Sequence, residues 1–182
     1  MSLDELLFIH INQGFSSSGW STFFSIATRL GNGYVLALLI VPSLFFLDRK
    51  RFREQLLPMV ISVALGGLAV TVAKVAVDRP RPAEHFKGTD TEVHTPLGTP
   101  SDRSFPSGHT QTAFGAAAYL SCMYPVAIPA FVVLAALVGL SRTALGVHFP
   151  SDVLVGAISG IVFALGIFFL NKRRLQRRAP PY

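Results

Sequence analysis

Long apolar runs restrict the fold of this chain more than any other feature of its sequence. Residues 56–77, 126–145 and 153–170 approach or exceed the roughly 18 to 20 residues that a helix needs to cross the hydrocarbon core of a membrane. Only 14% of the residues are charged, against roughly 25% in soluble domains, and 51% are hydrophobic. The sequence therefore predicts an all-α, polytopic membrane helical bundle that forms a single domain over residues 1–182.

The apolar segments predict six membrane-spanning helices and one shorter helix. The shorter helix covers residues 2–11, with Ser2 as a candidate N-cap, and we expect it to lie at the membrane interface. The first span is short because it ends at the turn signal of residues 31–33, so it either starts earlier, near Phe15, or is tilted or partly buried. The expected spans are Trp20–Leu30, Tyr34–Leu47, Leu56–Val77, His109–Tyr124, Val126–Leu145 and Val153–Leu170.

The span at residues 109–124 is rich in alanine and glycine, which lets neighbouring helices approach closely. It also contains Cys122, the only cysteine of the chain, which excludes an internal disulfide. We expect this cysteine to contribute to packing.

Two clusters of basic residues predict the orientation of the bundle. The formal net charge is +6, but much of it lies at residues 49–53 and 172–178, beside apolar spans, which is typical of an orientation signal and not of a nucleic-acid site. Both clusters should be cytoplasmic, which puts both termini inside and the polar loop 79–105 outside. Asp4 and Glu5 stand where a signal peptide would be basic, so we expect no cleavable signal.

Three polar islands interrupt this apolar chain, at residues 74–82, 106–109 and 142–152. Working outward from the basic clusters, all three fall on the external face. Charge near lipid is costly and is usually functional or held at the interface. Their cations, two histidines, carboxylate and hydroxyl suit an anionic phosphate better than a metal.

Each island alone also has a plainer explanation. Ser107 and Gly108 fit a helix N-terminus that binds an anion, but they also fit an exposed turn. Lys74 could simply extend its amine to the lipid headgroups. His148 and Asp152 are four residues apart, so the carboxylate can hold one ring nitrogen; alternatively, the histidine is on the surface and the aspartate caps the last helix.

Together the islands match three motifs at every defining position and in order. These are K-x6-R-P at residues 74–82, P-S-G-H at residues 106–109 and S-R-x5-H-x3-D at residues 141–152. In these motifs the chain resembles the type 2 phosphatidic acid phosphatase family of membrane lipid phosphatases, which shares its phosphate site with vanadium haloperoxidases. Arg79-Pro80 duplicates the R-P pair, but only Arg81 has the family spacing from Lys74.

The resemblance implies a role for each motif residue. His148 would attack phosphorus and form a phosphohistidine, Asp152 would orient it, and His109 would protonate the leaving oxygen and later activate water. The phosphate ligands that it implies are Lys74, Arg81, Ser107, Gly108 and Arg142. The remaining outer carboxylates are scattered through one loop, so neither a metal nor another cofactor is expected.

The implied activity is dephosphorylation of a membrane lipid phosphate or diphosphate at the outer face of a bacterial cytoplasmic membrane. Lipid A 1-phosphate or undecaprenyl diphosphate is the expected substrate, followed by phosphatidylglycerophosphate or phosphatidic acid. The alternative is a non-catalytic lipid-phosphate binder or transporter, which would not need both histidines. The apolar spans argue against a soluble haloperoxidase, and the oligomeric state stays open.

Overall fold

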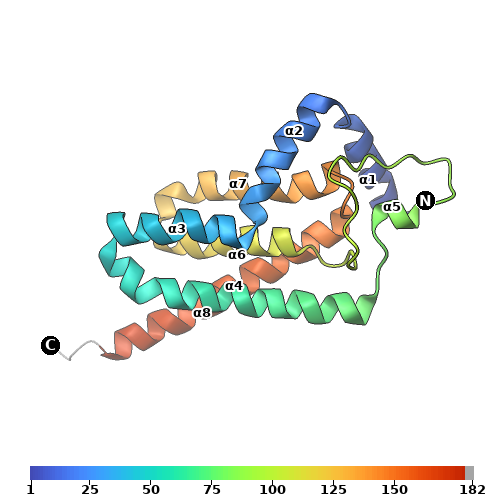
Figure 1. Ribbon diagram of the computed structural model, residues 1–182. Helices are drawn as coiled ribbons and strands as arrows, with labels where there is room; N and C mark the ends of the chain where they lie inside the picture. The colour runs from blue at the N-terminus through green and yellow to red at the C-terminus, as the bar shows by residue number, and fades with distance from the viewer. Residues whose placement is uncertain (179–182) are drawn as a thin grey trace.

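The computed structural model describes residues 1–178, and this part of the chain is built from helices without a strand (Figure 1). The α-helices are α1 (Leu3–Gly14), α2 (Ser18–Ala27), α3 (Gly33–Leu47), α4 (Arg49–Val77), α5 (Pro82–His85), α6 (Gly108–Met123), α7 (Ile128–Ala144) and α8 (Pro150–Arg178). Two short 3-10 helices, η1 (Thr28–Gly31) and η2 (Pro125–Ala127), precede α3 and α7. The prediction of an all-α fold is confirmed.

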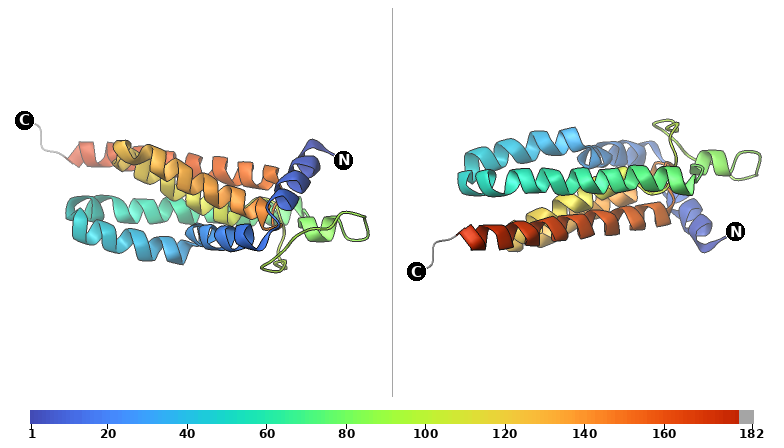
Figure 2. Two further views of the ribbon diagram at one scale, coloured as in Figure 1. Left: turned by 90° about the horizontal axis from the view of Figure 1, so that it is seen from above. Right: turned by 90° about the horizontal axis from the view of Figure 1, so that it is seen from below.

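Helices α3, α4, α6, α7 and α8 run alongside one another as a bundle (Figures 1 and 2). Helix α6 is central and contacts α4, α7 and α8. Its approach to α8 depends on small residues, because a Cβ added to Gly160 would lie 2.3 Å from the carbonyl oxygen of Gln111. A Cβ on Gly156 would lie 2.5 Å from the carbonyl oxygen of Ser107. The close packing predicted for the alanine- and glycine-rich segment is confirmed.

Polar caps decide where several helices begin. Helix α1 starts with a capping box, in which the Glu5 amide donates to Ser2 Oγ at 3.3 Å and the Ser2 amide donates to Glu5 Oε2 at 2.8 Å. The predicted N-cap at Ser2 is therefore confirmed. Helix α4 starts after Asp48, whose carboxylate accepts the Arg51 amide at 3.1 Å. This cap brings the basic cluster 49–53 into the helix, ahead of the apolar span predicted at residues 56–77.

The predicted count of six spans is not confirmed. Three segments are long and apolar enough to cross a membrane: Arg49–His85, Pro125–Ala144 and Pro150–Arg177. A fourth results if Ser18–Gly31 and Gly33–Leu47, which are bent by 64°, form one span. The predicted span at residues 20–30 is the ten-residue α2 followed by η1, because the extended backbone of Asn32 breaks the helix there. Helix α6, with 16 residues, falls short of the length of a span.

Helix α1 and the basic end of α8 lie at opposite ends of the bundle (Figure 1). The first turn of α1 reaches the start of α8, where the Ser151 amide donates to Asp4 Oδ1 at 2.8 Å. That both termini lie on the cytoplasmic face stays a prediction.

Helix α1 also fastens the polar connection between α5 and α6. Asn12 Nδ2 donates to the carbonyl oxygens of His94 and Ala144, each at 2.9 Å, and Asn12 Oδ1 accepts the His94 amide at 2.9 Å. Phe8 packs against Phe149 with ring centroids 5.3 Å apart. This end of the bundle is therefore held by contacts between segments that are distant in sequence.

Candidate active site

The three polar islands of the sequence meet at the end of the bundle that α1 covers. They lie at the last turn of α4 and the segment after it, the start of α6, the end of α7 with its following turn, and the first turn of α8. A backbone hydrogen bond of 3.0 Å from Ser107 to the Asp152 carbonyl joins two of them. The structure thus gathers the predicted site residues Lys74, Arg81, Ser107, Gly108, His109, Arg142, His148 and Asp152 in one region.

His148 and Asp152 form the buried pair that their spacing predicts. His148 Nδ1 lies 3.4 Å from Asp152 Oδ2, which is longer than most hydrogen bonds. The same Oδ2 accepts the Phe149 amide at 2.9 Å and the Ser104 hydroxyl at 2.5 Å. Since Nδ1 faces the carboxylate, Nε2 is the ring nitrogen that remains for chemistry, and Arg81 Nη1 lies 3.4 Å from it.

The turn before His148 requires a glycine. Gly146 has φ +73°, in the left-handed region, and an added Cβ would lie 2.3 Å from the carbonyl oxygen of His94. The amides of Val147 and His148 both donate to the Arg142 carbonyl, at 3.1 and 3.2 Å. The backbone of the arginine therefore holds the turn that presents the imidazole.

Burial keeps the His148 imidazole neutral. It lowers the pKa from its usual 6.5 to about 4, against the hydrogen bond to Asp152, and the positive charges of Arg142 and Arg81 add to the lowering. At neutral pH the ring therefore has the free lone pair that a nucleophile needs.

A carboxylate from the loop lies on two of the predicted phosphate ligands. Asp102 Oδ2 is 2.9 Å from Lys74 Nζ, and Asp102 Oδ1 is 2.5 Å from Arg81 Nη2. Partial burial acts to raise the Asp102 pKa, but the hydrogen bonds from Lys74 and Arg81 outweigh it and lower the pKa to about 2. The two cations therefore already form an anion-binding pair.

Arg142 adds a third cation, with one donor left free. Its Nη1 donates to Thr28 Oγ1 at 2.7 Å, and the residue is only 8% exposed. Its Nε is the one buried side-chain nitrogen or oxygen without a hydrogen-bond partner in residues 1–178. An unsatisfied buried donor costs about 1–3 kcal/mol, and more when charged, so this position favours a bound anion.

Ser107 and His109 lie where α6 begins. Ser107 Oγ accepts from the Thr110 amide at 3.4 Å and from Thr110 Oγ1 at 2.9 Å, so its predicted capping role is confirmed. His109 lines the same cavity as Lys74 and Asp102, and the charges of Arg81 and Arg142 act on its ring.

A cavity of about 1120 Å³ adjoins the site. Residues of α3 and α4 line it together with Lys74, Gly108 and His109. A smaller, apolar cavity of about 250 Å³ between α3, α4 and α6 borders it at Ala37 and Thr112. Part of the polar site therefore lies next to apolar space between the helices.

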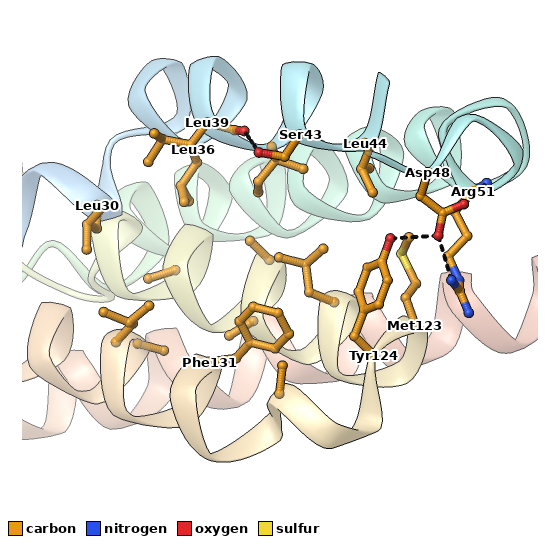
Figure 3. Close-up of a pocket in the computed structure, with 18 of the residues that line it drawn as sticks. Leu30, Leu36, Leu39, Ser43, Leu44, Asp48, Arg51, Met123, Tyr124 and Phe131 are labelled. Carbon is orange, nitrogen blue, oxygen red and sulfur yellow. Dashed lines mark hydrogen bonds and ion pairs between the residues drawn. The ribbon is translucent and has the colours of Figure 1, made fainter. Parts of the chain in front are cut away.

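A third, apolar cavity of about 800 Å³ lies between α3, α6 and α7 and borders the smaller cavity at Leu36 (Figure 3). Leucines such as Leu36 and Leu39 line it, and at one end Asp48 accepts from Tyr124 and Arg51, at 3.1 and 2.5 Å. None of the predicted site residues borders this cavity, so we do not assign phosphate chemistry to it.

Three residues that contact the predicted ones were missed from the sequence, namely Arg79, Asp102 and Ser104, and Asp4 contacts Arg79 in turn. Arg79 Nη1 donates to Asp152 Oδ1 at 2.7 Å, and the Ser104 hydroxyl donates to the other oxygen of the same carboxylate. Only Arg79 gave a signal, as the first arginine of a repeated R-P pair. No group of three His, Cys, Asp or Glu side chains placed as metal ligands occurs in the part of the chain that the structure describes.

An apolar helical bundle with a His–Asp pair, a second histidine and converging cations at one end defines a membrane protein with an anion-binding site. The model of the PAP2 superfamily matches residues 55–176, and the chain belongs to this superfamily. The family resemblance of the three motifs is therefore confirmed.

Two solved structures and a curated relative show how similar the chain is to known members. LpxE from Aquifex aeolicus matches with a TM-score of 0.78 and 33% identity over 93% of this chain and 96% of its own. The PAP2-type phosphatidylglycerolphosphate phosphatase from Bacillus subtilis matches with a TM-score of 0.71 and 26% identity over 100% of this chain and 90% of its own. The lipid A 1-phosphatase of Rhizobium etli is 35% identical over 57% of this chain and 45% of its own length. The chain spans about half the length of the first curated relatives that it matches.

Proposed function

We propose that this protein is a phosphatase that removes a phosphate group from a membrane lipid through a phosphohistidine on His148. One arrangement carries the proposal: Asp152 faces one nitrogen of the buried imidazole, and Arg81 lies beside the other. The unpaired Nε of Arg142 adds a donor for phosphate oxygens. Cations placed where phosphoryl charge develops are usually the largest contribution to such a reaction.

The proposed reaction has two steps. In the first, His148 Nε2 attacks phosphorus, the bond to the lipid oxygen breaks, and His109 gives that oxygen a proton. In the second, His109 takes a proton from water, whose oxygen attacks phosphorus as the phosphorus–nitrogen bond breaks. Inorganic phosphate leaves and His148 returns to its first state. The residues proposed to hold the phosphate oxygens are Lys74, Arg81, Arg142, Ser107 and the Gly108 amide.

A lipid fits this site better than a water-soluble phosphate. The cavity that Lys74, Gly108 and His109 line borders an apolar cavity between α3, α4 and α6, where a hydrocarbon chain can be buried. Among the relatives, the name lipid A 1-phosphatase favours lipid A 1-phosphate as the first substrate to test. Undecaprenyl diphosphate follows, and then phosphatidylglycerophosphate and phosphatidic acid.

We also propose an orientation. The basic end of α8, residues 172–178, supports a cytoplasmic position for that end of the bundle. The site end then faces the outside of the cytoplasmic membrane. Because α1 covers the site end, the N-terminus belongs on the outer side with it.

Phosphate release by the purified full-length protein tests the function. The assay uses detergent and the four lipids lipid A 1-phosphate, undecaprenyl diphosphate, phosphatidylglycerophosphate and phosphatidic acid. We expect phosphate release from at least one of them. Release should continue in the presence of a chelator and be inhibited by vanadate, which mimics five-coordinate phosphorus. His148→Ala should release none. Binding of all four lipids without release from any of them would make the protein a non-catalytic binder, and loss of activity in chelator with recovery in magnesium would contradict the metal-free mechanism.

A second experiment separates the two histidines. After rapid mixing with labelled substrate, we expect acid-labile label on the wild-type protein and none on His148→Ala. His109→Ala should keep more activity on a diphosphate than on a monophosphate ester, because a phosphate leaving group needs less protonation than an alkoxide. Labelling of His148→Ala would overturn the assignment of the nucleophile.

A further inference from the structure

A network of polar side chains lies behind Asp152, on the side away from His148. It joins Asp4 of α1, Arg79 of the segment between α4 and α5, and Ser151 of α8. We propose that Arg79 and Asp4 are positioning residues that fix the Asp152 carboxylate against His148, so that α1 takes part in catalysis. This inference rests on the proposed function, because it assigns these residues a role in that reaction.

The guanidinium of Arg79 is held on both branches. Its Nη1 donates to Asp152 Oδ1 and to Ser151 Oγ, both at 2.7 Å, and its Nη2 donates to Asp4 Oδ2 at 2.6 Å. Its central carbon lies 4.0 Å from the centroid of the Phe149 ring. An arginine fixed by hydrogen bonds on both branches and by an aromatic face has little freedom to move, which suits a group that orients another.

Asp4 holds the other side of the network. Its Oδ1 accepts the Ser151 amide at 2.8 Å, and its Oδ2 accepts the Ser151 hydroxyl at 2.6 Å. The serine hydroxyl therefore donates to Asp4 while it accepts from Arg79. These contacts join residues 147 positions apart in sequence and fix the first turn of α8, from which the Asp152 side chain projects.

The distribution of contacts on Asp152 shows what Arg79 contributes. Arg79 occupies Oδ1, so that Oδ2 is the oxygen that faces His148. Asp152 is fully buried, and an isolated buried carboxylate is costly unless it is paired. The neutral imidazole and the Ser104 hydroxyl supply no charge, whereas Arg79 does. Arg79 also pairs with Asp4, so it neutralises the negative charge of Asp152 only in part. The rest of that charge acts on the His148 ring.

Asp4 is not the only residue that attaches α1 to the bundle. Asn12 and Phe8 fasten the same helix to the bundle through separate contacts. Glu5 makes a hydrogen bond with His85 at 3.0 Å and does not contact Asp152. Glu5→Gln, which keeps the acceptor oxygen of the capping box, is therefore a matched control for the loss of a carboxylate from α1.

Steady-state kinetics of the purified full-length protein test the proposal. We expect Arg79→Ala to lower kcat roughly 10- to 100-fold, the usual effect of removing a residue that orients a catalytic side chain. KM and the inhibition constant of vanadate should stay within about twofold of wild type. Arg79→Lys should recover part of kcat, Asp4→Asn should lower it by a smaller factor, and Glu5→Gln should match wild type.

A double-mutant cycle with Asp152→Asn separates positioning from simple structural support. If Arg79 acts through Asp152, Arg79→Ala should cost little further once Asp152 is Asn. An equal loss in both backgrounds, or an Arg79→Ala variant with more than half of the wild-type kcat, would overturn the proposal.

A measurement without turnover keeps this inference distinct from the proposed function. In NMR of ¹⁵N-histidine-labelled protein, Arg79→Ala should raise the pKa of His148 from about 4 toward its usual 6.5, because Asp152 loses its cation and acts more strongly on the ring. An unchanged titration would overturn the positioning role. If the titration shifts but wild-type protein releases no phosphate from any lipid, the network stands and the proposed function fails.

Discussion

At the residue scale, a carboxylate of the protein occupies part of the proposed phosphate site. Asp102 contacts Lys74 and Arg81, the same cations that we assign to the phosphate oxygens. Its side chain is 56% exposed, so the loop carboxylate can leave into water when a phosphate arrives. Asp102 is then a competitor of the substrate and not a ligand of it.

Removing this competitor should tighten anion binding. For Asp102→Asn we expect the inhibition constant of vanadate to fall by about fivefold, because exposed ion pairs are worth up to about 1 kcal/mol. Asp90→Asn, an exposed aspartate of the same loop, is the control and should leave the constant unchanged. Weaker inhibition of Asp102→Asn would mean that Asp102 aligns the two cations instead of competing for them.

The lowered pKa of His148 predicts a loss of stability in acid. In the unfolded chain the imidazole takes up a proton near its usual pKa of 6.5, whereas in the folded protein it does so only near pH 4. The free energy of unfolding should therefore fall as the pH drops from 6.5 to 4, by up to about 1.4 kcal/mol per pH unit, and this contribution is complete above pH 6.5.

Thermal unfolding in detergent between pH 4 and 8 measures this effect. His148→Asn should lose less stability than wild type over the acid range, whereas His10→Asn, at an exposed histidine of α1, should follow wild type. Parallel curves for wild type and His148→Asn would contradict the assignment.

Site residues that stand at fixed spacing could be predicted from the sequence. Those that reach the site from distant parts of the chain could not. His148 and Asp152 are four positions apart, so their contact could be predicted from helical geometry. Asp4 and Ser104 meet the same region from 147 and 48 positions away. A single polar residue in a short helix or a loop carries no periodic pattern, so only the folded chain reveals these partners.

At the scale of the elements, α6 and α8 approach each other closely in the core. A Cβ at Gly160 meets backbone atoms of α6, which cannot rotate away as a side chain would. Helix limits were predicted to within two residues for α6 and α7. The start of α4 was not, because the Asp48 cap and the charged residues after it extend the helix beyond its apolar part.

Gly160→Ala should therefore destabilise the protein by about 1–3 kcal/mol, the usual cost of overpacking. Gly166→Ala lies on the same helix with nothing within 4 Å of the added carbon, and it should stabilise the protein by about 0.5–1 kcal/mol through helix propensity alone. Unfolding midpoints in one detergent compare the two variants. Equal midpoints would show that α6 and α8 can separate without cost.

At the scale of the whole molecule, the position of α1 bears on the side of the membrane that the N-terminus takes. Six spans would return both termini to the cytoplasm. The structure joins α2 to α3 through a 64° bend and leaves the first helix at the site end, so we propose an external N-terminus instead. The sequence could not decide this, because an apolar segment of helical length does not reveal whether it crosses a membrane or folds back against its neighbours.

Labelling of single cysteines in a Cys122→Ala background tests the revised topology. In spheroplasts, an impermeant maleimide should label cysteines at Leu3 and Leu97, which are 73% and 59% exposed, and should label one at Arg174 only after lysis. Protection of the Leu3 position would restore the arrangement with both termini inside. Labelling of Arg174 in intact spheroplasts would invert the whole bundle.

The cavities that α3, α4 and α6 line have a consequence for how the proposed reaction should be measured. A lipid that enters through the side of the bundle arrives by diffusion within the plane of the membrane, and its supply depends on its mole fraction in one leaflet and not on its bulk molarity. Diluting mixed micelles at constant composition should leave the rate per protein unchanged, whereas adding inert detergent should slow it. Encounter with substrate is in this sense a two-dimensional problem, set by surface density and lateral mobility.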